Sequence, residues 1–102
     1  LGPTAMGRGV AIPHARLASA PRIMGYFARL EKGVDFDAAD GAPVDLVFLL
    51  LAPEDAGADH LRALARVSRL LRDEGRCAKL RSTQDSNALY AILVETLTTD
   101  AA

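Results

Sequence analysis

The fold is indicated most directly by the stretch VDLVFLLL at residues 44–51. It is almost entirely apolar and contains valine and phenylalanine, which favour strands over helices. A strand that is apolar on both faces is expected at the centre of a sheet, covered on both sides. Pro53 follows shortly after and should end the strand, because proline has no N–H to donate to a ladder. The stretch therefore predicts the central strand of a layered sheet.

Two more strands are predicted before this one. Residues 10–12 form a short apolar run that should stop at Pro13, and His14 follows directly at its end. Residues 23–30, IMGYFARL, favour a strand because of their aromatic side chains. We expect residues 15–22 between them to be an irregular connection, since alanine, serine and proline there break any period.

Helices are predicted in the second half of the chain. Asp59 is placed to cap the main helix, and Gly75 is a stop signal after it. A short helical turn at residues 77–80 and a last helix capped by Asp85 or Ser86 should follow. This order, strands and then helices, predicts an α/β domain with helices on a sheet. The apolar stripe of the main helix recurs at helical spacing and is formed by Leu61, Leu64, Val67, Leu70 and Leu71.

The composition of the chain is typical of a single globular domain. The 102 residues suit one domain, residues 1–102, and half of them are apolar, as in a packed globule. A net charge of −1 provides no strong field for nucleic acid or an anionic membrane. No apolar run approaches the roughly 18 residues of a membrane span. The single cysteine, Cys77, excludes an internal disulfide and fits a reducing, cytoplasmic compartment. Because the chain begins at Leu1 rather than at methionine, we expect that an N-terminal part is missing.

The two histidines of the chain are its candidate functional residues. His14 comes at the end of one predicted strand, and His60 begins the main helix after another. Ligands of open α/β sheets bind at the carboxyl ends of strands, and helix N-termini favour anions. If the two strands are parallel and adjacent, the rings can meet. The sequence thus permits a nucleophilic imidazole at His14, with His60 beside it as a hydrogen-bond donor to a phosphoryl group.

Other interpretations are open at this point. Isolated histidines are most often structural or exposed, and Cys77 most simply is a buried apolar thiol. A zinc site needs three or four ligands, so we expect no metal, and no other cofactor motif is visible. There is no GxSxG for a serine hydrolase, and Gly7-Arg8-Gly9 is only a fragment of a nucleotide-binding loop.

Three segments in order along the chain resemble one bacterial family. GRGVAIPH at residues 7–14 resembles the G-x-G-[IV]-A-[IL]-P-H motif of enzyme IIA domains of the fructose/mannitol class, from the phosphoenolpyruvate-dependent phosphotransferase system. FDAADGAPVDLVF at residues 36–48 resembles the family's F-D-A-x-D-x-x-P-V-D-L-x-F segment. DHL at residues 59–61 resembles its second histidine motif. The sequence of residues 40–53 is most similar to the nitrogen-regulatory branch of this family.

The resemblance implies a fold and specific roles. The fold is a three-layer α/β/α domain with a mixed sheet, whose N-terminal strand and helices precede Leu1, together with a phosphate-binding arginine. His14 would accept a phosphoryl group from an HPr-like carrier, and His60 would stabilise that group. Thr4 would belong to the phosphoryl loop, where the family commonly has Ser-Thr-Gly and this chain has Pro3-Thr4-Ala5. No metal or cofactor is implied.

Three functions follow from the resemblance as expectations. The first is a phosphohistidine carrier with a regulatory output on a target such as a transporter or sensor kinase. The second is a sugar-specific IIA domain that passes phosphate to a IIB domain for fructose or hexitol uptake. The third is a non-catalytic module that binds a partner according to its phosphorylation state. None involves nucleic acid or insertion into a membrane.

Overall fold

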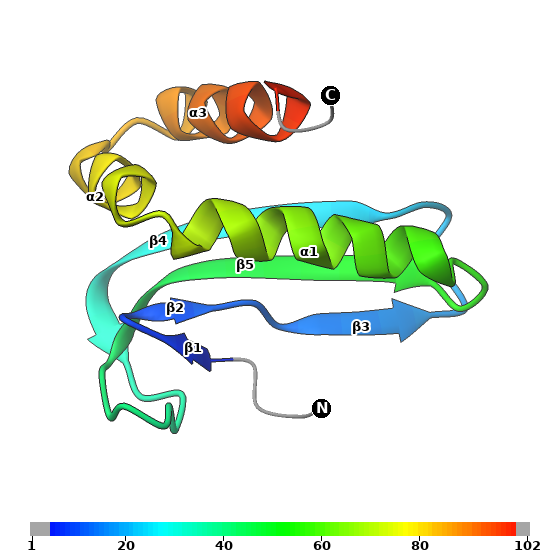
Figure 1. Ribbon diagram of the computed structural model, residues 1–102, viewed down its shortest axis with the longest axis horizontal. Helices are drawn as coiled ribbons and strands as arrows, with labels where there is room; N and C mark the ends of the chain where they lie inside the picture. The colour runs from blue at the N-terminus through cyan, green and yellow to red at the C-terminus, as the bar shows by residue number, and fades with distance from the viewer. Residues whose placement is uncertain (1–4, 100–102) are drawn as a thin grey trace. The chain divides into compact units, whose positions relative to one another are not determined.

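The computed structural model describes residues 5–99 and divides the chain into two compact units, Leu1–Arg62 and Ala63–Ala102. The boundary falls inside a helix. The first unit holds a mixed five-stranded sheet, and the second holds most of the helical part of the chain (Figure 1). The predicted α/β class with a mixed sheet is therefore confirmed. The strands are β1 (Ala5–Gly7), β2 (Val10–Ala11), β3 (His14–Leu17), β4 (Met24–Val34) and β5 (Val44–Pro53).

β5 is the centre of the sheet, as its apolar sequence predicts. It pairs in parallel with β2 and β3 and antiparallel with β4 (Figure 1). Its side chains alternate strictly between buried and half-buried, and it ends at Pro53 as expected. The prediction that both faces are covered thus holds fully for one face and in part for the other. One face supplies the core of the sheet, formed on β5 by Val44, Leu46, Phe48, Leu50 and Ala52.

β2 and β3 both pair with β5 and are separated by a short interruption. β2 ends at Ala11, and pairing resumes at His14, which lies opposite Leu50. Pro13 cannot donate a hydrogen bond, but its carbonyl accepts one from the Leu50 N–H at 2.9 Å. Proline therefore interrupts the strand without ending it. Two predictions are corrected: His14 begins a strand instead of ending one, and residues 15–22 are not wholly irregular.

The turn between β1 and β2 has an unusual backbone. Gly7, Arg8 and Gly9 all have positive φ, at 87°, 57° and 80°. Glycine adopts this conformation at little steric cost, which explains the two glycines of the motif as turn residues. The side chain of Asp40 holds the turn, because its Oδ2 accepts the Arg8 N–H at 2.8 Å and its Oδ1 accepts the Ala42 N–H at 3.1 Å.

Within the described residues, three helices follow the sheet along the chain: α1 (Ala58–Arg72), α2 (Glu74–Ser82) and α3 (Ser86–Thr99). α1 begins two residues earlier than expected, so Asp59 lies in its first turn, where it pairs with Arg62 instead of capping the helix. Leu61 is 62% exposed, and His60 is buried in its place. The first position of the predicted stripe is therefore wrong, whereas Val67, Leu70 and Leu71 are buried as predicted.

In the second unit, Asp73 separates two helices. It caps α2 by accepting the Arg76 N–H, so Gly75 lies within α2 and is not the end of α1. Asp85 accepts the Ala88 N–H at the start of α3, as predicted. Cys77 is buried, and its thiol donates to the Leu71 carbonyl at 3.2 Å. The buried side chains of this unit are Val67, Leu70, Leu71, Cys77, Leu80 and Leu93.

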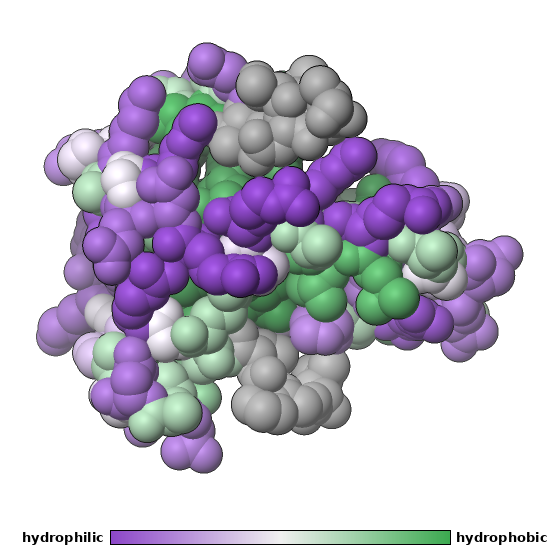
Figure 2. Space-filling model, in the orientation of Figure 1, coloured by the Kyte–Doolittle hydropathy of each residue, from purple (hydrophilic) through white to green (hydrophobic). Residues whose placement is uncertain are grey.

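Hydrophilic side chains cover much of the face seen in Figure 2, in keeping with a chain of which a quarter is charged (25%). Within residues 5–99, no helix combines the length and apolarity that a membrane crossing requires.

Candidate functional site

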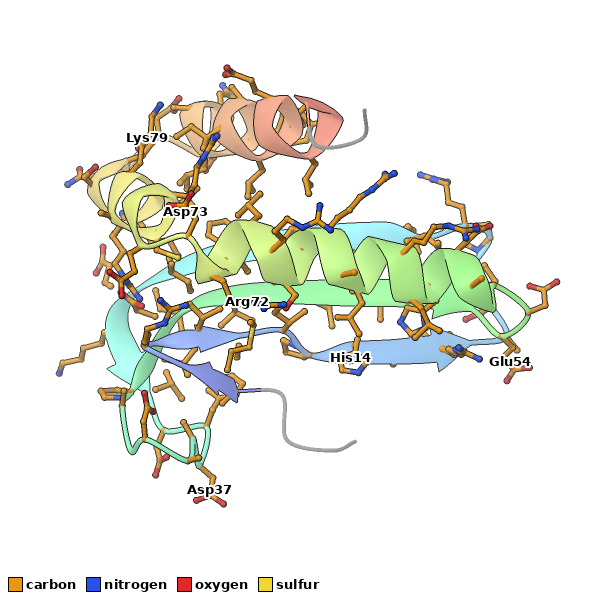
Figure 3. The ribbon with its side chains drawn as sticks, viewed as in Figure 1. His14, Asp37, Glu54, Arg72, Asp73 and Lys79 are labelled. Carbon is orange, nitrogen blue, oxygen red and sulfur yellow. The ribbon has the colours of Figure 1, made fainter. Side chains whose placement is uncertain are left out.

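The structure brings the two histidines together within the first unit. Their ring centroids are 6.0 Å apart, and the rings meet edge to face at an interplanar angle of 60°. His14 lies where β3 begins (Figure 3), and His60 lies in the first turn of α1. The condition stated from the sequence is met, because β3 and β5 are adjacent and parallel. His14 lies opposite Leu50, near the carboxyl end of β5, although it begins β3 itself.

His14 is half-buried and held by one backbone contact. Its Nδ1 is 2.9 Å from the carbonyl oxygen of Ile12. A carbonyl oxygen only accepts, so Nδ1 carries the hydrogen in this contact. In a neutral ring the other nitrogen, Nε2, then keeps its lone pair. The bond to Ile12, two residues earlier, thus both orients the ring and selects the nitrogen that can act as a nucleophile.

His60 is 5% exposed and is held from the opposite side. Arg16 donates from its Nε to the Nδ1 of His60 at 3.1 Å. A guanidinium group has no acceptor, so Nδ1 of His60 must provide the lone pair and Nε2 carries the hydrogen. Among the described residues, nothing accepts from that buried Nε2–H. A buried donor without an acceptor is costly, and it marks a place where an added acceptor is favourable.

The charge state of His60 follows from the same surroundings. Burial lowers its pKa below the ordinary 6.5, and the positive charges of Arg16 and of protonated His14 lower it further. The ring is therefore neutral at physiological pH. Because its Nδ1 lone pair accepts from Arg16, the neutral ring can donate a hydrogen bond only from Nε2.

Sequence reasoning identified both histidines but missed Arg16. Residues 14 and 16 lie on the same side of a strand, because side chains alternate along it. This signal is present in the sequence, but the alanine, serine and proline of residues 15–22 favour a connection over a strand. Thr4, the candidate phosphoryl-loop residue, lies outside the described residues. Within the part of the chain that is described, no three histidine, cysteine or acidic side chains are grouped to hold a metal ion.

A sequence model of one protein family matches residues 1–96, nearly the whole chain. Its description is "Phosphoenolpyruvate-dependent sugar phosphotransferase system, EIIA 2". The chain belongs to this EIIA family. The resemblance carried by the three sequence motifs is therefore confirmed.

Several relatives of this EIIA chain are named as nitrogen regulatory proteins. The one from Bradyrhizobium diazoefficiens is 60% identical over 93 residues, which cover 91% of this chain and 61% of the relative. The one from Escherichia coli is 42% identical and covers 94% of this chain and 60% of its own length. A fructose-specific EIIA component of Haloferax volcanii is 37% identical, with coverages of 90% and 60%.

A solved structure has the same fold as this EIIA chain. The nitrogen regulatory protein IIA-Ntr from Neisseria meningitidis superposes with a TM-score of 0.85 at 39% identity. The match covers 90% of this chain and 63% of that protein. The chain thus spans about three fifths of the length of the relatives described above.

Proposed function

We propose that this EIIA chain carries a phosphoryl group on His14, receives it from an HPr-like carrier protein, and acts as a regulator within the phosphotransferase system. The observation that carries the proposal is the bond from His14 Nδ1 to the Ile12 carbonyl, with His60 beside the ring. Phosphoryl transfer depends mainly on positioning and on stabilisation of charge. In this proposal the bond to Ile12 positions the ring of His14, and His60 stabilises the charge of the phosphoryl group.

The chemical step uses the free nitrogen of His14. The lone pair of Nε2 attacks phosphorus as the phosphorus–nitrogen bond to the carrier's phosphohistidine breaks, and that electron pair returns to the carrier's imidazole. The Nδ1 hydrogen stays on His14, where the Ile12 carbonyl accepts it and stabilises the positive charge of the phosphorylated ring. Onward transfer is the same step in reverse towards another acceptor.

His60 stabilises the transferred group in this proposal. The phosphoryl oxygens are strong acceptors, and the buried Nε2–H of His60 has no acceptor of its own among the described residues. A hydrogen bond from a neutral donor lowers the energy of the developing charge without binding it as an ion pair. The group is therefore held but remains transferable.

The regulatory output is supported by the names of the relatives. Those from Bradyrhizobium and Escherichia are called nitrogen regulatory proteins, at 60% and 42% identity. The target would be a protein such as a transporter or a sensor kinase, and the location is cytoplasmic. If the output is phosphorylation-dependent binding, His14→Asp should change which proteins a pull-down recovers.

A sugar-specific role is the second candidate, because the Haloferax relative is a fructose-specific EIIA component. The two roles separate when phosphorylated protein is incubated with IIB domains and fructose or mannitol. Sugar phosphate forms only if the chain belongs to a sugar transporter.

The phosphorylation site is tested in the full-length protein with a phosphorylated HPr-like carrier, followed by intact-mass measurement. We expect one added phosphoryl group in the wild type and none in His14→Gln. His60→Gln should still be labelled, but about a hundredfold more slowly, since one charge-stabilising donor is lost. Labelling of His14→Gln at the wild-type level would refute the assignment.

A further inference from the structure

We propose that Arg16 is a positioning residue, which fixes the ring of His60 so that its Nε2–H, and only that edge, is available to the phosphoryl group on His14. The inference rests on the proposed function and extends it from the two histidines to a third residue. It rests on the hydrogen bond from Arg16 Nε to His60 Nδ1 and on the unpartnered Nε2 at the other edge of the same ring.

The sheet register places Arg16 where this contact is possible. Arg16 lies opposite Ala52 on β5, as His14 lies opposite Leu50, and both partners on β5 are buried. His14 and Arg16 are therefore neighbours on the same face of the sheet. His60 meets one of them through the ring and the other through a hydrogen bond.

The Arg16 contact removes an ambiguity that a neutral imidazole otherwise has. Without a donor at Nδ1, the hydrogen can sit on either ring nitrogen, and the ring can turn over. A guanidinium Nε–H at 3.1 Å favours the form with the lone pair at Nδ1 and the hydrogen at Nε2. The donor to the phosphoryl group is then present in every molecule before the carrier arrives.

The charge on Arg16 acts in the same direction. After burial, Arg16 is the largest cause of the lowered pKa of His60, and His14 adds to it. Asp59 precedes His60 on α1, but its carboxylate is paired with Arg62. Loss of Arg16 should therefore free the tautomer of His60 and make the ring easier to protonate.

The first experiment measures His60 without any phosphoryl group, by nitrogen-15 NMR of histidine-labelled protein over a pH titration. In the wild type we expect the hydrogen on Nε2 and a pKa below 6.5. In Arg16→Met the pKa should rise and both ring nitrogens should share the hydrogen. Arg16→Lys, which keeps a charge and a donor, should restore the wild-type state at least in part. Arg22→Met removes another exposed arginine and is the matched control.

The second experiment compares phosphorylation rates by phosphoramidate across pH. At high pH we expect Arg16→Met to be about twofold slower than the wild type, because about half of its neutral His60 then lacks the Nε2 hydrogen. At low pH the defect should shrink, because both nitrogens of a protonated ring carry hydrogen. If Arg16 acted only through packing, the ratio of the wild-type rate to the Arg16→Met rate would not vary with pH.

The outcomes separate this inference from the proposed function. If Arg16→Met leaves the pKa and tautomer of His60 unchanged, or if its defect is independent of pH, the role of Arg16 is overturned. If the wild type accepts no phosphoryl group on His14, the proposed function fails, while the NMR result still decides what Arg16 does to His60.

Discussion

At the scale of single residues, the site depends on backbone and side-chain contacts that set each hydrogen. The Ile12 carbonyl determines which nitrogen of His14 is free, and Arg16 determines which nitrogen of His60 is a donor. Asp40 acts in a comparable way on the turn before the site, where it accepts from the Arg8 N–H. Each of these hydrogen bonds fixes the position of one hydrogen. The loss of one of them should therefore change the properties of that group and of few others.

Asp40 is the residue whose local effect is easiest to isolate. Its hydrogen bonds from the Arg8 and Ala42 amides lower its pKa below 3.8. The carboxylate is therefore favoured in the folded state, and its contribution to stability is present above about that pH and is lost as the pH falls through the lowered pKa. In Asp40→Ala we expect the Arg8 amide to exchange its hydrogen faster, as measured by NMR. Asp55→Ala is the control and should leave that amide protected.

At the scale of elements, the sheet depends on how closely β4 and β5 approach. Gly25 on β4 lies opposite Leu50, with the ring of Phe48 beside it. A Cβ at Gly25 would lie 2.7 Å from two carbons of that ring, closer than van der Waals contact allows. Phe48 is itself only 7% exposed, so its ring has little room to move. The glycine is thus needed for close packing and not for a positive φ.

We therefore expect Gly25→Ala to lower the free energy of unfolding by about 1–3 kcal/mol, the usual cost of overpacking a core. Chemical denaturation measures this change. Ala28→Gly, at an exposed position of the same strand, should cost less than Gly25→Ala. If Gly25→Ala is as stable as the wild type, Phe48 does not restrict the strand.

At the scale of the whole molecule, the buried His60 couples the site to folding. Its pKa is lowered from 6.5 in the folded state, mainly by burial. As the pH falls below 6.5, the unfolded chain takes up a proton on this residue and the folded protein resists doing so. The contribution of His60 to stability is therefore present above pH 6.5 and declines as the pH falls towards the folded-state pKa.

Thermal or urea unfolding between about pH 8 and about pH 5 should show this decline. In His60→Gln the part of the decline due to His60 should disappear, and the difference in stability between the two proteins should therefore depend on pH. His14→Gln is the matched control and should retain the His60 contribution. A pH-independent difference between wild type and His60→Gln would contradict the burial of a neutral ring.

The sequence by itself determined the family, the central strand and the two histidines. These depend on features that are local in the chain: the motif at residues 7–14, the apolar run at 44–51, and a histidine at the start of a helix. The α/β class follows from them because a strand of that apolarity must be enclosed in a sheet. Spacing alone also showed that His14 and His60 could meet if their strands were parallel.

Only the tertiary structure decided that pairing with β5 continues after Pro13, through β3. It also decided that His60 is buried in place of Leu61, and that Arg16 reaches His60. The last contact joins residues 44 positions apart and depends on the register of β3 against β5 and on where α1 begins. Local propensities do not determine register, because it is set by side chains packing across strands. For this reason the sequence could indicate the two histidines of the candidate site, but neither Arg16 nor which nitrogen of each ring is available.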